Sequence, residues 1–377
     1  MEPKIRFKGF EGEWKTSTIG EIAPLQRGYD LPTNNVISGT IPVVYSNGIL
    51  RFHNEGKCQA PAIITGRSGT IGKFTYIDHG EYWPHNTSLW VTTFHKNYPR
   101  FVYYFFQNVG FEKYATGSGV PTLNRNDIHK HIESIPSNKE EQQAIASYFT
   151  SLDSQISAST SRLASLKQMK AASLQAMFPQ EGETVPKIRF KGFKGEWKKV
   201  KADSIFKTFN EKNRPDLPVL SATQDRGMVT RESIGYNIFH DTSNEATYKH
   251  ILPGQFVIHL RSFQGGFAHS EIEGIASPAY TIIDFKNKDL YHDYYWRYVF
   301  MSKEFIKRLE LITYGIRDGR SISYDEFKEM SFLVPSKEEQ IKIASYLKNL
   351  DRQISLQSQR LEKLKQIKSA CLDKMFV

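Results

Sequence analysis

The sequence predicts an α+β protein: two globular domains of mixed β-sheet and short helices, separated by two long antiparallel coiled-coil helices in a pseudo-two-fold arrangement. Three observations predict this fold. The chain contains the same lead sequence twice. A segment with the apolar periodicity of a long helix follows each domain. Between these parts lie short runs rich in Val, Ile, Tyr, Phe and Thr, separated by Gly, Pro and Asn, which are typical of strands.

Length and composition predict more than one domain. The 377 residues exceed the size at which a single hydrophobic core usually stops growing. No stretch approaches the roughly 20 apolar residues of a membrane span. The segment Met1–Arg6 lacks the apolar run of a secretory signal, so we expect a cytoplasmic protein that contacts no membrane. Cys58 and Cys371 are the only cysteines, which excludes a disulfide framework and a cysteine-based zinc site.

The charge balance favours a polyanionic partner. The formal net charge is +10 and the isoelectric point is about 9.3. Each lysine or arginine placed on a phosphate releases a condensed counterion, which favours binding to nucleic acid. Charge alone does not identify that partner, because many basic proteins bind no nucleic acid.

Two pairs of segments repeat along the chain. Residues 3–15 read PKIRFKGFEGEWK and residues 186–198 read PKIRFKGFKGEWK, so 12 of 13 positions are identical. Residues 140–157 and residues 338–355 are identical at 12 of 18 positions. The repeat unit is therefore a short lead, a long variable region and a helical tail.

The regions between the shared segments, residues 16–136 and residues 199–335, differ in length and sequence. Shared parts of a duplicated chain can bind the same kind of partner twice, whereas divergent parts must act differently in each half. We expect four parts: a first domain over 1–136, a central helix and linker over 137–180, a second domain over 181–335, and a C-terminal helix over 336–377.

Each tail is predicted to be one long helix. Pro136 and Pro335 precede the tails, and paired glutamates follow in the first turn, where carboxylates favour the helix dipole. A helix of about 38 residues is about 57 Å long, too long to be covered by one small domain. We expect the tails to pair with each other, with an ordinary bundle helix as the alternative. The apolar seam that predicts pairing consists of Ile145, Phe149, Leu152, Ile156, Leu163 and Leu166, and of Ile343, Leu347, Leu350, Ile354, Leu361 and Leu364.

One glycine-rich segment, residues 66–74, comes close to a phosphate-binding loop. A loop of that kind ending at Gly72-Lys73 requires glycine at the position of Arg67 and Ser or Thr at the position of Phe74. The other half keeps an Arg-Ser pair at Arg261 but no lysine. We therefore expect a basic loop that places Arg67 or Arg261 against DNA, with a plain turn as the alternative.

Patterns for catalysis and metal binding are absent from the sequence. The histidines show no HExxH or other paired-ligand spacing. Glu326 and Lys328 have the spacing of some nuclease motifs, without an identifiable partner aspartate. We expect no catalytic residue and no metal site.

Basic, amide and hydroxyl side chains occur together in the presumed loops. Arginine pairs with guanine and Asn or Gln with adenine in the major groove, although most protein–DNA hydrogen bonds go to the backbone. The candidate DNA-binding residues are Arg27, Tyr29, Arg51, Asn54, Arg67, Ser68, Lys73, Asn86, Asn124 and Arg125 in the first half, and Gln224, Arg226, Arg231, Arg261, Ser262, Gln264, Arg317 and Arg320 in the second.

Over its whole length the chain resembles the specificity subunit of a type I restriction-modification system, the HsdS family. The duplicated lead, the Pro-Ser starts of the tails with their Glu-Glu-Gln, and the Leu-Asp-x-Gln-Ile stretches at 152–156 and 350–354 carry the resemblance. Gly117–Pro121 with Ile128, and Gly315 with Ile322, resemble the segment that closes each recognition domain in that family.

The resemblance implies a non-catalytic subunit of a restriction endonuclease and adenine-N6 DNA methyltransferase complex. Each domain would be a target-recognition domain that reads one half of a bipartite, asymmetric duplex DNA target. The paired helices would set the spacing and dock two methyltransferase subunits, and motor-nuclease subunits would bind as well. This chain would bind no cofactor, whereas its partners would use S-adenosylmethionine, ATP and Mg²⁺.

Two other functions are consistent with the sequence. One is a nuclease or methyltransferase with a site of unfamiliar pattern. The other is a coiled-coil scaffold with two protein-binding domains, which would show no steep salt dependence in DNA binding. A specificity subunit whose partner carries methylation and cleavage in one fused chain has the same sequence features.

Overall fold

The computed structural model describes residues 2–117, 119–223, 226–234, 242–259, 266–312 and 322–377. The chain divides into two compact units. Unit 1 contains Met1–Ser161 and Gln359–Val377, and unit 2 contains Arg162–Ser358. Each unit therefore combines one globular head with parts of both long helices, α4 (Lys139–Ala176) and α9 (Lys337–Met375). The predicted ranges separate heads from helices instead: 1–136, 137–180, 181–335 and 336–377.

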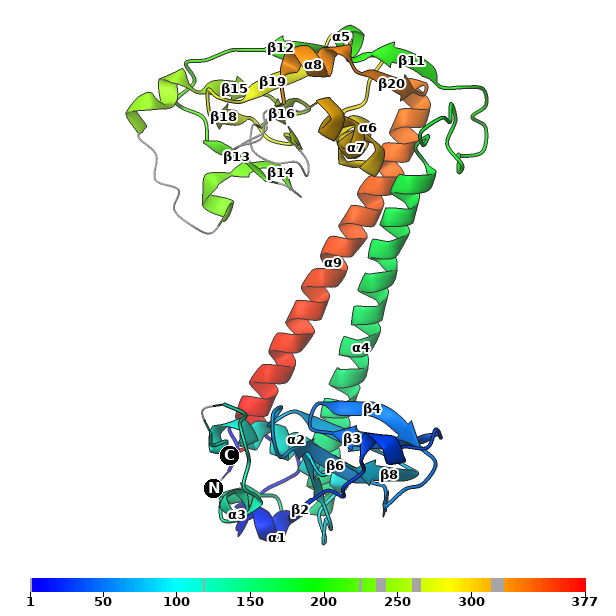
Figure 1. The fold of residues 1–377 in the computed structure, drawn as a ribbon. Coiled ribbons are helices and arrows are strands. Elements are labelled where there is room, and N and C mark those ends of the chain that lie inside the picture. Colours follow the sequence, from blue (N-terminus) through cyan, green and yellow to red (C-terminus); the bar gives the residue numbers. More distant parts are fainter. Residues whose placement is uncertain (1, 118, 224–225, 235–241, 260–265, 313–321) are drawn as a thin grey trace. The chain divides into compact units, whose positions relative to one another are not determined.

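The head of unit 1 is mixed α+β (Figure 1). Its strands are β1 (Lys15–Thr18), β2 (Leu25–Arg27), β3 (Ile41–Tyr45), β4 (Gly48–His53), β5 (Cys58–Gln59), β6 (Ala62–Gly66), β7 (Phe74–Ile77), β8 (Glu81–Pro84), β9 (Ser88–Val91) and β10 (Ile132–Ile135). Its helices are α1 (Ile19–Ile22), α2 (Pro99–Val109) and α3 (Arg125–His129), with 3-10 turns at Thr33–Asn35 and Phe111–Tyr114.

The head of unit 2 is of the same class. Its described strands are β11 (Lys198–Lys201), β12 (Phe206–Phe209), β13 (Leu220–Thr223), β14 (Gly227–Thr230), β15 (Lys249–Ile251), β16 (Phe256–Ile258), β17 (Phe267–His269), β18 (Gly274–Ala276), β19 (Thr281–Phe285) and β20 (Ser331–Val334). Its described helices are α5 (Ala202–Ile205), α6 (Asp293–Met301), α7 (Lys303–Ile312) and α8 (Tyr324–Glu329), with 3-10 turns at Arg231–Ile234 and Thr242–Thr247.

The two heads share one scaffold although their sequences differ. Each contains a four-stranded antiparallel sheet, with the strand order β2-β9-β6-β7 in unit 1 and β12-β19-β16-β17 in unit 2. In each, the strand after the lead pairs antiparallel with the strand before a long helix, as β1 with β10 and β11 with β20. The duplication therefore extends through the regions that the sequence identifies as variable.

The heads differ in how regularly an inserted second sheet is formed. In unit 1 the inserted sheet has four strands, β4-β3-β8-β5, in which β3 and β8 are parallel. In the described part of unit 2 the pairs β13-β14 and β15-β18 occupy the same places in the chain, and an isolated parallel bridge from Val219 to Ile275 joins them. The two heads therefore share the order of these strands as well, with less regular pairing in unit 2.

A buried ion pair explains why the leads and the helix starts are repeated together. In unit 1, the Arg6 guanidinium donates two hydrogen bonds to the Glu141 carboxylate, at 2.7 and 2.9 Å. In unit 2, Arg189 donates two to Glu339, at 2.7 and 2.8 Å. Both glutamates are buried, and each charge-assisted hydrogen bond raises the pKa of its arginine. The two segments are shared because they bind each other.

The glutamine after each of these glutamates joins the helix to its head. The Gln142 side chain accepts a hydrogen bond from the Tyr98 backbone N–H (2.7 Å) at the start of α2 and donates one to the Pro136 carbonyl (2.8 Å). Gln340 accepts from the backbone N–H of His292 (2.9 Å) at the start of α6. A buried glutamine thus satisfies a free N–H of a helix end in both heads.

Within each unit the two long helices run antiparallel. In unit 1, Asp153 of α4 forms an ion pair with Lys368 of α9 (2.6 Å) and accepts a hydrogen bond from Tyr104 (2.9 Å). In unit 2, Asp351 of α9 pairs with Lys170 of α4 at 2.6 Å, and Tyr298 donates to it as well. The antiparallel pairing of the tails is confirmed, and in each unit one ion pair joins the two helices.

Most of the predicted seam is buried inside the units. Ile145, Phe149 and Leu152 belong to the core of unit 1, and Leu166, Ile343, Leu347 and Leu350 belong to the core of unit 2. Leu364 and Ile354 pack against these cores, Leu361 is buried, and Ile156 and Leu163 are partly exposed.

We expect Arg6→Met to destabilise unit 1 by about 3–5 kcal/mol, because the Glu141 carboxylate would remain buried without its partner charge. The double variant Arg6→Met/Glu141→Leu should recover most of the loss, since no unpaired charge is then buried. Urea denaturation followed by tryptophan fluorescence measures both effects. The control is Lys201→Met, which breaks an ion pair with Glu329 whose side chains are 61% and 63% exposed. It should cost less than about 1 kcal/mol, and an equal loss in the control would contradict the argument from burial.

His129, the last residue of α3, joins this helix to β2. Its Nε2 atom accepts a hydrogen bond from the Leu25 backbone N–H (2.8 Å), so the imidazole is neutral. Burial lowers the pKa of His129, with the charge of Arg125 adding to the effect. The unfolded chain therefore binds the proton first, and stability is lost as pH falls from the ordinary value near 6.5 through the lower folded pKa. His129→Gln keeps an acceptor that does not titrate. Its urea midpoint should fall less than that of the unmodified chain between pH 7.5 and pH 5, and equal falls would refute the assignment.

Candidate nucleic-acid interface

One edge of the scaffold sheet in unit 1 gathers most of the predicted DNA-binding loops. The antiparallel register pairs Arg27 with Leu89 and Gly66 with Ser88. The ends of β2 and β6 therefore lie beside the start of β9, and β7 starts beside the end of β6. Loops that leave these four strand ends meet at one edge of the sheet.

The loop between β6 and β7 is fixed by backbone hydrogen bonds. The Arg67 N–H donates to the Thr87 carbonyl (2.8 Å), and the Arg67 carbonyl accepts from the Leu123 N–H (2.8 Å). The loop turns so tightly that a Cβ at Gly66 would lie 1.8 Å from the Thr70 carbonyl oxygen. A strand, β7, follows the loop directly, so this segment does not have the strand–loop–helix form of a phosphate-binding loop. The basic loop is thus a rigid platform at the sheet edge.

Polar contacts join neighbouring candidates at this edge. The Asp30 carboxylate accepts hydrogen bonds from Arg27 (3.3 Å) and from Asn86. Tyr29 forms an isolated β-bridge with His85 and is 37% exposed, and partial burial raises its pKa. Arg27, Tyr29 and Asn86 therefore lie together.

The turn between β3 and β4 adds residues that the sequence did not single out. The Lys73 ammonium donates to the Asn47 carbonyl (3.3 Å), and Ser46 lies against Gly66 and Gly69. The only sequence signal for this turn is Asn47-Gly48, a dipeptide typical of tight hairpins.

Four of the remaining candidates of unit 1 are exposed and Ser68 is partly buried, and not all of the five lie at the edge. Arg51 lies on β4, the outer strand of the inserted sheet, and Asn54 follows that strand. The Asn124 side-chain oxygen caps α3 by accepting from the Asn126 N–H (3.0 Å), and Arg125 is the first residue of that helix. Ser68 bridges to Thr122 in the segment before α3.

In unit 2, two candidates lie within the described residues. Arg226 is in the turn between β13 and β14, next to Gly227, whose Cβ would meet the His269 carbonyl at 2.2 Å. Arg231 follows β14 and donates to the Ser221 hydroxyl (3.4 Å), while its buried Nη1 atom has no partner within the described part. The other candidates lie outside the described residues: Gln224, Arg261, Ser262, Gln264, Arg317 and Arg320.

The same sheet edge exists in unit 2. The register of β16 pairs Ile258 with Thr281 and with Phe267, so β16 ends and β17 begins side by side, as β6 and β7 do in unit 1. Arg261 follows β16 in the sequence and lies outside the described residues. The turn at Arg226 adjoins the opposite end of β17, where His269 lies.

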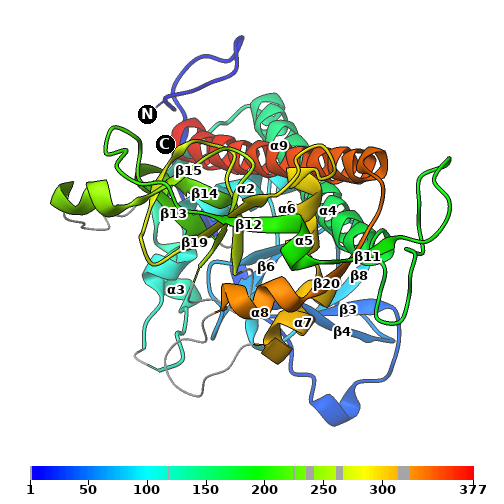
Figure 2. The same ribbon diagram turned by 90° about the horizontal axis from the view of Figure 1, so that it is seen from above.

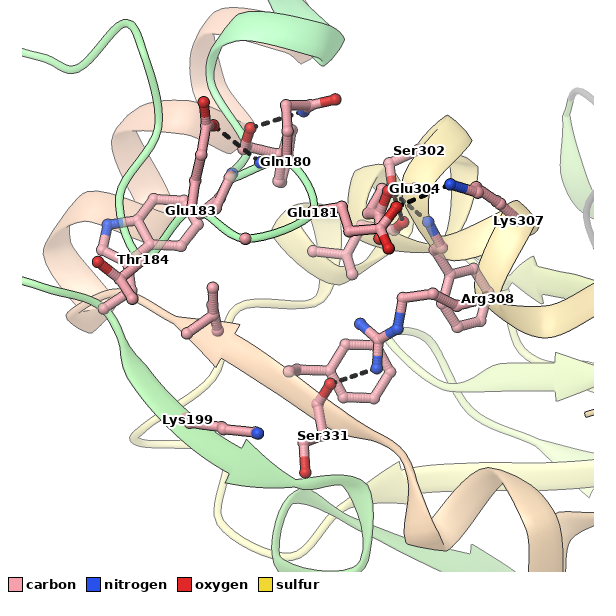
Figure 3. Close-up of a pocket in the computed structure, with 18 of the residues that line it drawn as sticks. Gln180, Glu181, Glu183, Thr184, Lys199, Ser302, Glu304, Lys307, Arg308 and Ser331 are labelled. Atoms are coloured by element: carbon pink, nitrogen blue, oxygen red, sulfur yellow. Dashed lines mark hydrogen bonds and ion pairs between the residues drawn. The ribbon is translucent and has the colours of Figure 1, made fainter. Parts of the chain in front are cut away.

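Unit 2 also contains a pocket of about 580 Å³ between the segment that follows α4 and the elements α7, β11 and β20 (Figure 3). Its charges are largely paired. Lys307 donates to Glu181 (2.8 Å) and lowers the pKa of that carboxyl. Arg308 donates to the Ser331 carbonyl and lies 5.4 Å from the Phe332 ring centre, and burial lowers its pKa. The lining residues include neither a histidine nor a cysteine and form no nucleophile–base pair.

Two negative findings concern the described residues alone. They contain no group of three or more His, Cys, Asp or Glu side chains that could hold a metal ion. Within the same ranges, no helix is both long and apolar enough to cross a membrane.

Comparisons with known proteins give one family model and several solved structures of similar fold. A family model described as the type I restriction modification DNA specificity domain matches residues 11–168 and 194–366. The crystal structure of the S subunit of a type I restriction-modification system from M. genitalium is similar over 100% of this chain and 99% of that chain, with a TM-score of 0.69 and 15% identity.

A structure that describes complex assembly and conformational transition of the type I R-M system is similar over 97% of this chain and 98% of that chain. Its TM-score is 0.51 and its identity is 14%. At these identities the likeness shows the fold. The search of the curated proteins found no match. Because the family model covers both repeats and most of the chain, the protein belongs to the family of type I restriction-modification DNA specificity domains.

Proposed function

We propose that this chain is the DNA-reading subunit of a type I restriction-modification complex, and that each head reads one half of a bipartite, asymmetric duplex target. The observation that carries the proposal is one scaffold sheet that occurs twice, built from two regions of the chain that differ in length and sequence. Two unlike reading surfaces on a common framework suit a target with two unlike halves.

The edge in unit 1 has the chemistry for this task. Arg27, Arg67 and Lys73 supply cations for phosphates or guanine, and Asn86 supplies an amide. The loops at this edge begin and end at strands of the sheet, so the sheet fixes the ends of their backbones. A rigid platform lowers the entropy that ordering side chains on DNA would cost.

The same proposal assigns the partners. Two methyltransferase subunits would bind this chain and carry S-adenosylmethionine, and motor-nuclease subunits would use ATP and Mg²⁺. The chain itself would be non-catalytic and would bind no cofactor. The paired helices α4 and α9 would set the spacing between the two half-sites and contribute to docking the methyltransferases.

Exchanging residues 16–136 for those of a homologue should change one half of the methylated motif and leave the other half unchanged. The exchange alters every loop at the first sheet edge and leaves the lead segment and the helices in place. Single-molecule methylation sequencing of a host that carries the hybrid and its partners reads both halves at once. The matched exchange of residues 199–335 should change only the other half. A change in both halves from one exchange would contradict the modular proposal.

Lys73→Ala should weaken duplex DNA binding for every sequence and lower the slope of log K against log salt by about 0.9, the value for one lost phosphate contact. Fluorescence anisotropy of the assembled complex over a salt series measures this slope. Lys96→Ala is the matched control, because Lys96 is exposed and follows the opposite end of β9. Equal slopes for Lys73→Ala and the unmodified chain would remove this edge from the DNA interface.

A further inference from the structure

The outer strand of the inserted sheet in unit 1 exposes large apolar side chains. In the order β4-β3-β8-β5 this strand is β4, and Figure 2 shows it beside β3, with β8 on the other side of β3. Ile49, Leu50 and Phe52 of β4 are 44%, 58% and 53% exposed. An exposed outer strand of this composition favours aggregation unless a partner covers it. Strand β4 is therefore a candidate contact surface.

A β-bulge distinguishes Leu50 from its neighbours on β4. The antiparallel register pairs Val43 with Arg51 and Val44 with Ile49, so Leu50 is an extra residue without a partner on β3. A bulge bends its strand and redirects a side chain, and bulges are frequent next to active sites. Leu50 is also the most exposed apolar residue of β4. The bulge thus presents Leu50 to a molecule that binds this strand.

The turn before β4 lies against the basic loop at the sheet edge. The Lys73 ammonium donates to the Asn47 carbonyl (3.3 Å), and a Cβ built on Gly66 would lie 3.1 Å from the Ser46 Cβ. Leu50 is three residues beyond Asn47, which is about 10 Å along an extended strand. The apolar residues of β4 therefore begin next to the proposed DNA-binding edge.

The corresponding strand of unit 2, β14, does not share this apolar surface. It occupies the place of β4 in the order of the second sheet. Its four pairs with β13 are consecutive, so the register contains no bulge within this strand. Met228 is buried and Val229 is partly buried. The exposed apolar strand is therefore a difference between the two heads and not a feature of their shared scaffold.

We infer that the β3–β4 hairpin enters the major groove of the half-site that unit 1 reads, where Leu50 contacts the C5-methyl group of a thymine. A two-stranded β-ribbon fits the major groove, and thymine is the base that presents a methyl group there. Ile49 and Phe52 would extend the apolar contact, and Arg51 would contact a phosphate. The inference rests on the proposed function and names one base type in the first half-site.

Three features of β4 favour DNA over a protein strand as the occupant. An added protein strand would pair with the backbone of β4, and a bulge on an outer strand interrupts that pairing. Arg51 and Lys73 supply cations near the apolar residues, which complements the phosphates of DNA. The surface is not repeated on β14, which suits a target whose two halves differ.

The test is a double-variant cycle between one side chain and one methyl group. Methylation sequencing identifies the half-site that the exchange of residues 16–136 changes, and each thymine in it is replaced in turn by uracil, which lacks only the methyl group. Fluorescence anisotropy of the assembled complex gives the Kd of the unmodified chain and of Leu50→Ala on each duplex. Ile132→Ala is the matched control, because Ile132 is 60% exposed on β10 of the same unit.

At one thymine, uracil should weaken binding by the unmodified chain and by the control about fourfold, the effect of one buried methyl group. Leu50→Ala should lose a similar factor on the thymine duplex and should not distinguish uracil from thymine at that position. Its slope of log K against log salt should equal that of the unmodified chain, because no phosphate contact is lost.

A half-site without thymine on either strand would overturn the inference and leave the proposed function intact. Equal effects of uracil on the unmodified chain and on Leu50→Ala at every position would do the same. A loss of methyltransferase subunits from the Leu50→Ala complex in native mass spectrometry would assign β4 to a protein and so overturn the inference. If the unmodified complex bound duplexes of every sequence equally, the proposed function would fail as well.

Discussion

Each unit depends on the buried bond between a lead arginine and the second glutamate of a long helix. In unit 1 this bond closes a ring. The lead runs into β1, β1 pairs with β10, β10 leads into α4, and Glu141 of α4 returns to Arg6 of the lead. Desolvating a carboxylate and a guanidinium costs several kcal/mol per ion, which only near-ideal bidentate geometry offsets. The lead is thereby held in one place, and α4 leaves the head in a fixed direction.

This bond limits how the two repeats could diverge. A change at either partner leaves a buried charge, so both partners are present in both repeats. The glutamine that follows each glutamate and bonds to the start of α2 or α6 is present in both as well. Side chains at the sheet edge carry no such penalty, because they are largely exposed and their backbones are fixed by strands. The two repeats therefore differ in the residues at the sheet edge and agree in the lead segment and the start of the long helix.

The difference between buried contacts and exposed side chains also determines what could be predicted from the sequence. The repeats, the long helices and their antiparallel pairing follow from patterns that buried contacts impose on residue identity. The shared scaffold sheet could not be found in this way. Its strands are three to five residues long, and Phe256–Ile258 and Ala62–Gly66 share only their burial. Both strands are buried at every position, so they lack the alternation of apolar and polar residues that would indicate their pairing register.

The candidate interface was predictable in part. A glycine-rich segment with Arg67 and Lys73 marks a basic loop, and the structure adds the reason why it lies beside Asn86, which is the antiparallel register of β6 and β9. The separation of Arg51 from that edge depends on the inserted sheet, whose parallel pairing of β3 and β8 has no signal in the sequence. Asn124 is a residue type that can bind adenine, and it is also a residue type that caps helices. The sequence does not distinguish these roles, whereas the hydrogen bond from the Asn126 N–H shows that its side chain caps α3.

Neither repeat contains a complete unit. In unit 1, the Phe376 ring at the end of the second repeat packs among Phe101, Phe105 and Phe149 of the first, with ring centres 5.8 to 6.1 Å apart. In unit 2, Phe178 at the end of the first repeat packs against Tyr295 of the second (5.6 Å). The end of one repeat therefore completes the aromatic core of the head in the other repeat. The last contacts of unit 1 join residues at opposite ends of the chain, a separation that makes loop closure slow. Unit 2 is closed by a tail that immediately precedes it in sequence. The two heads thus have the same contacts but different chain separations, and unit 2 can assemble from a continuous segment, whereas unit 1 requires both ends of the chain.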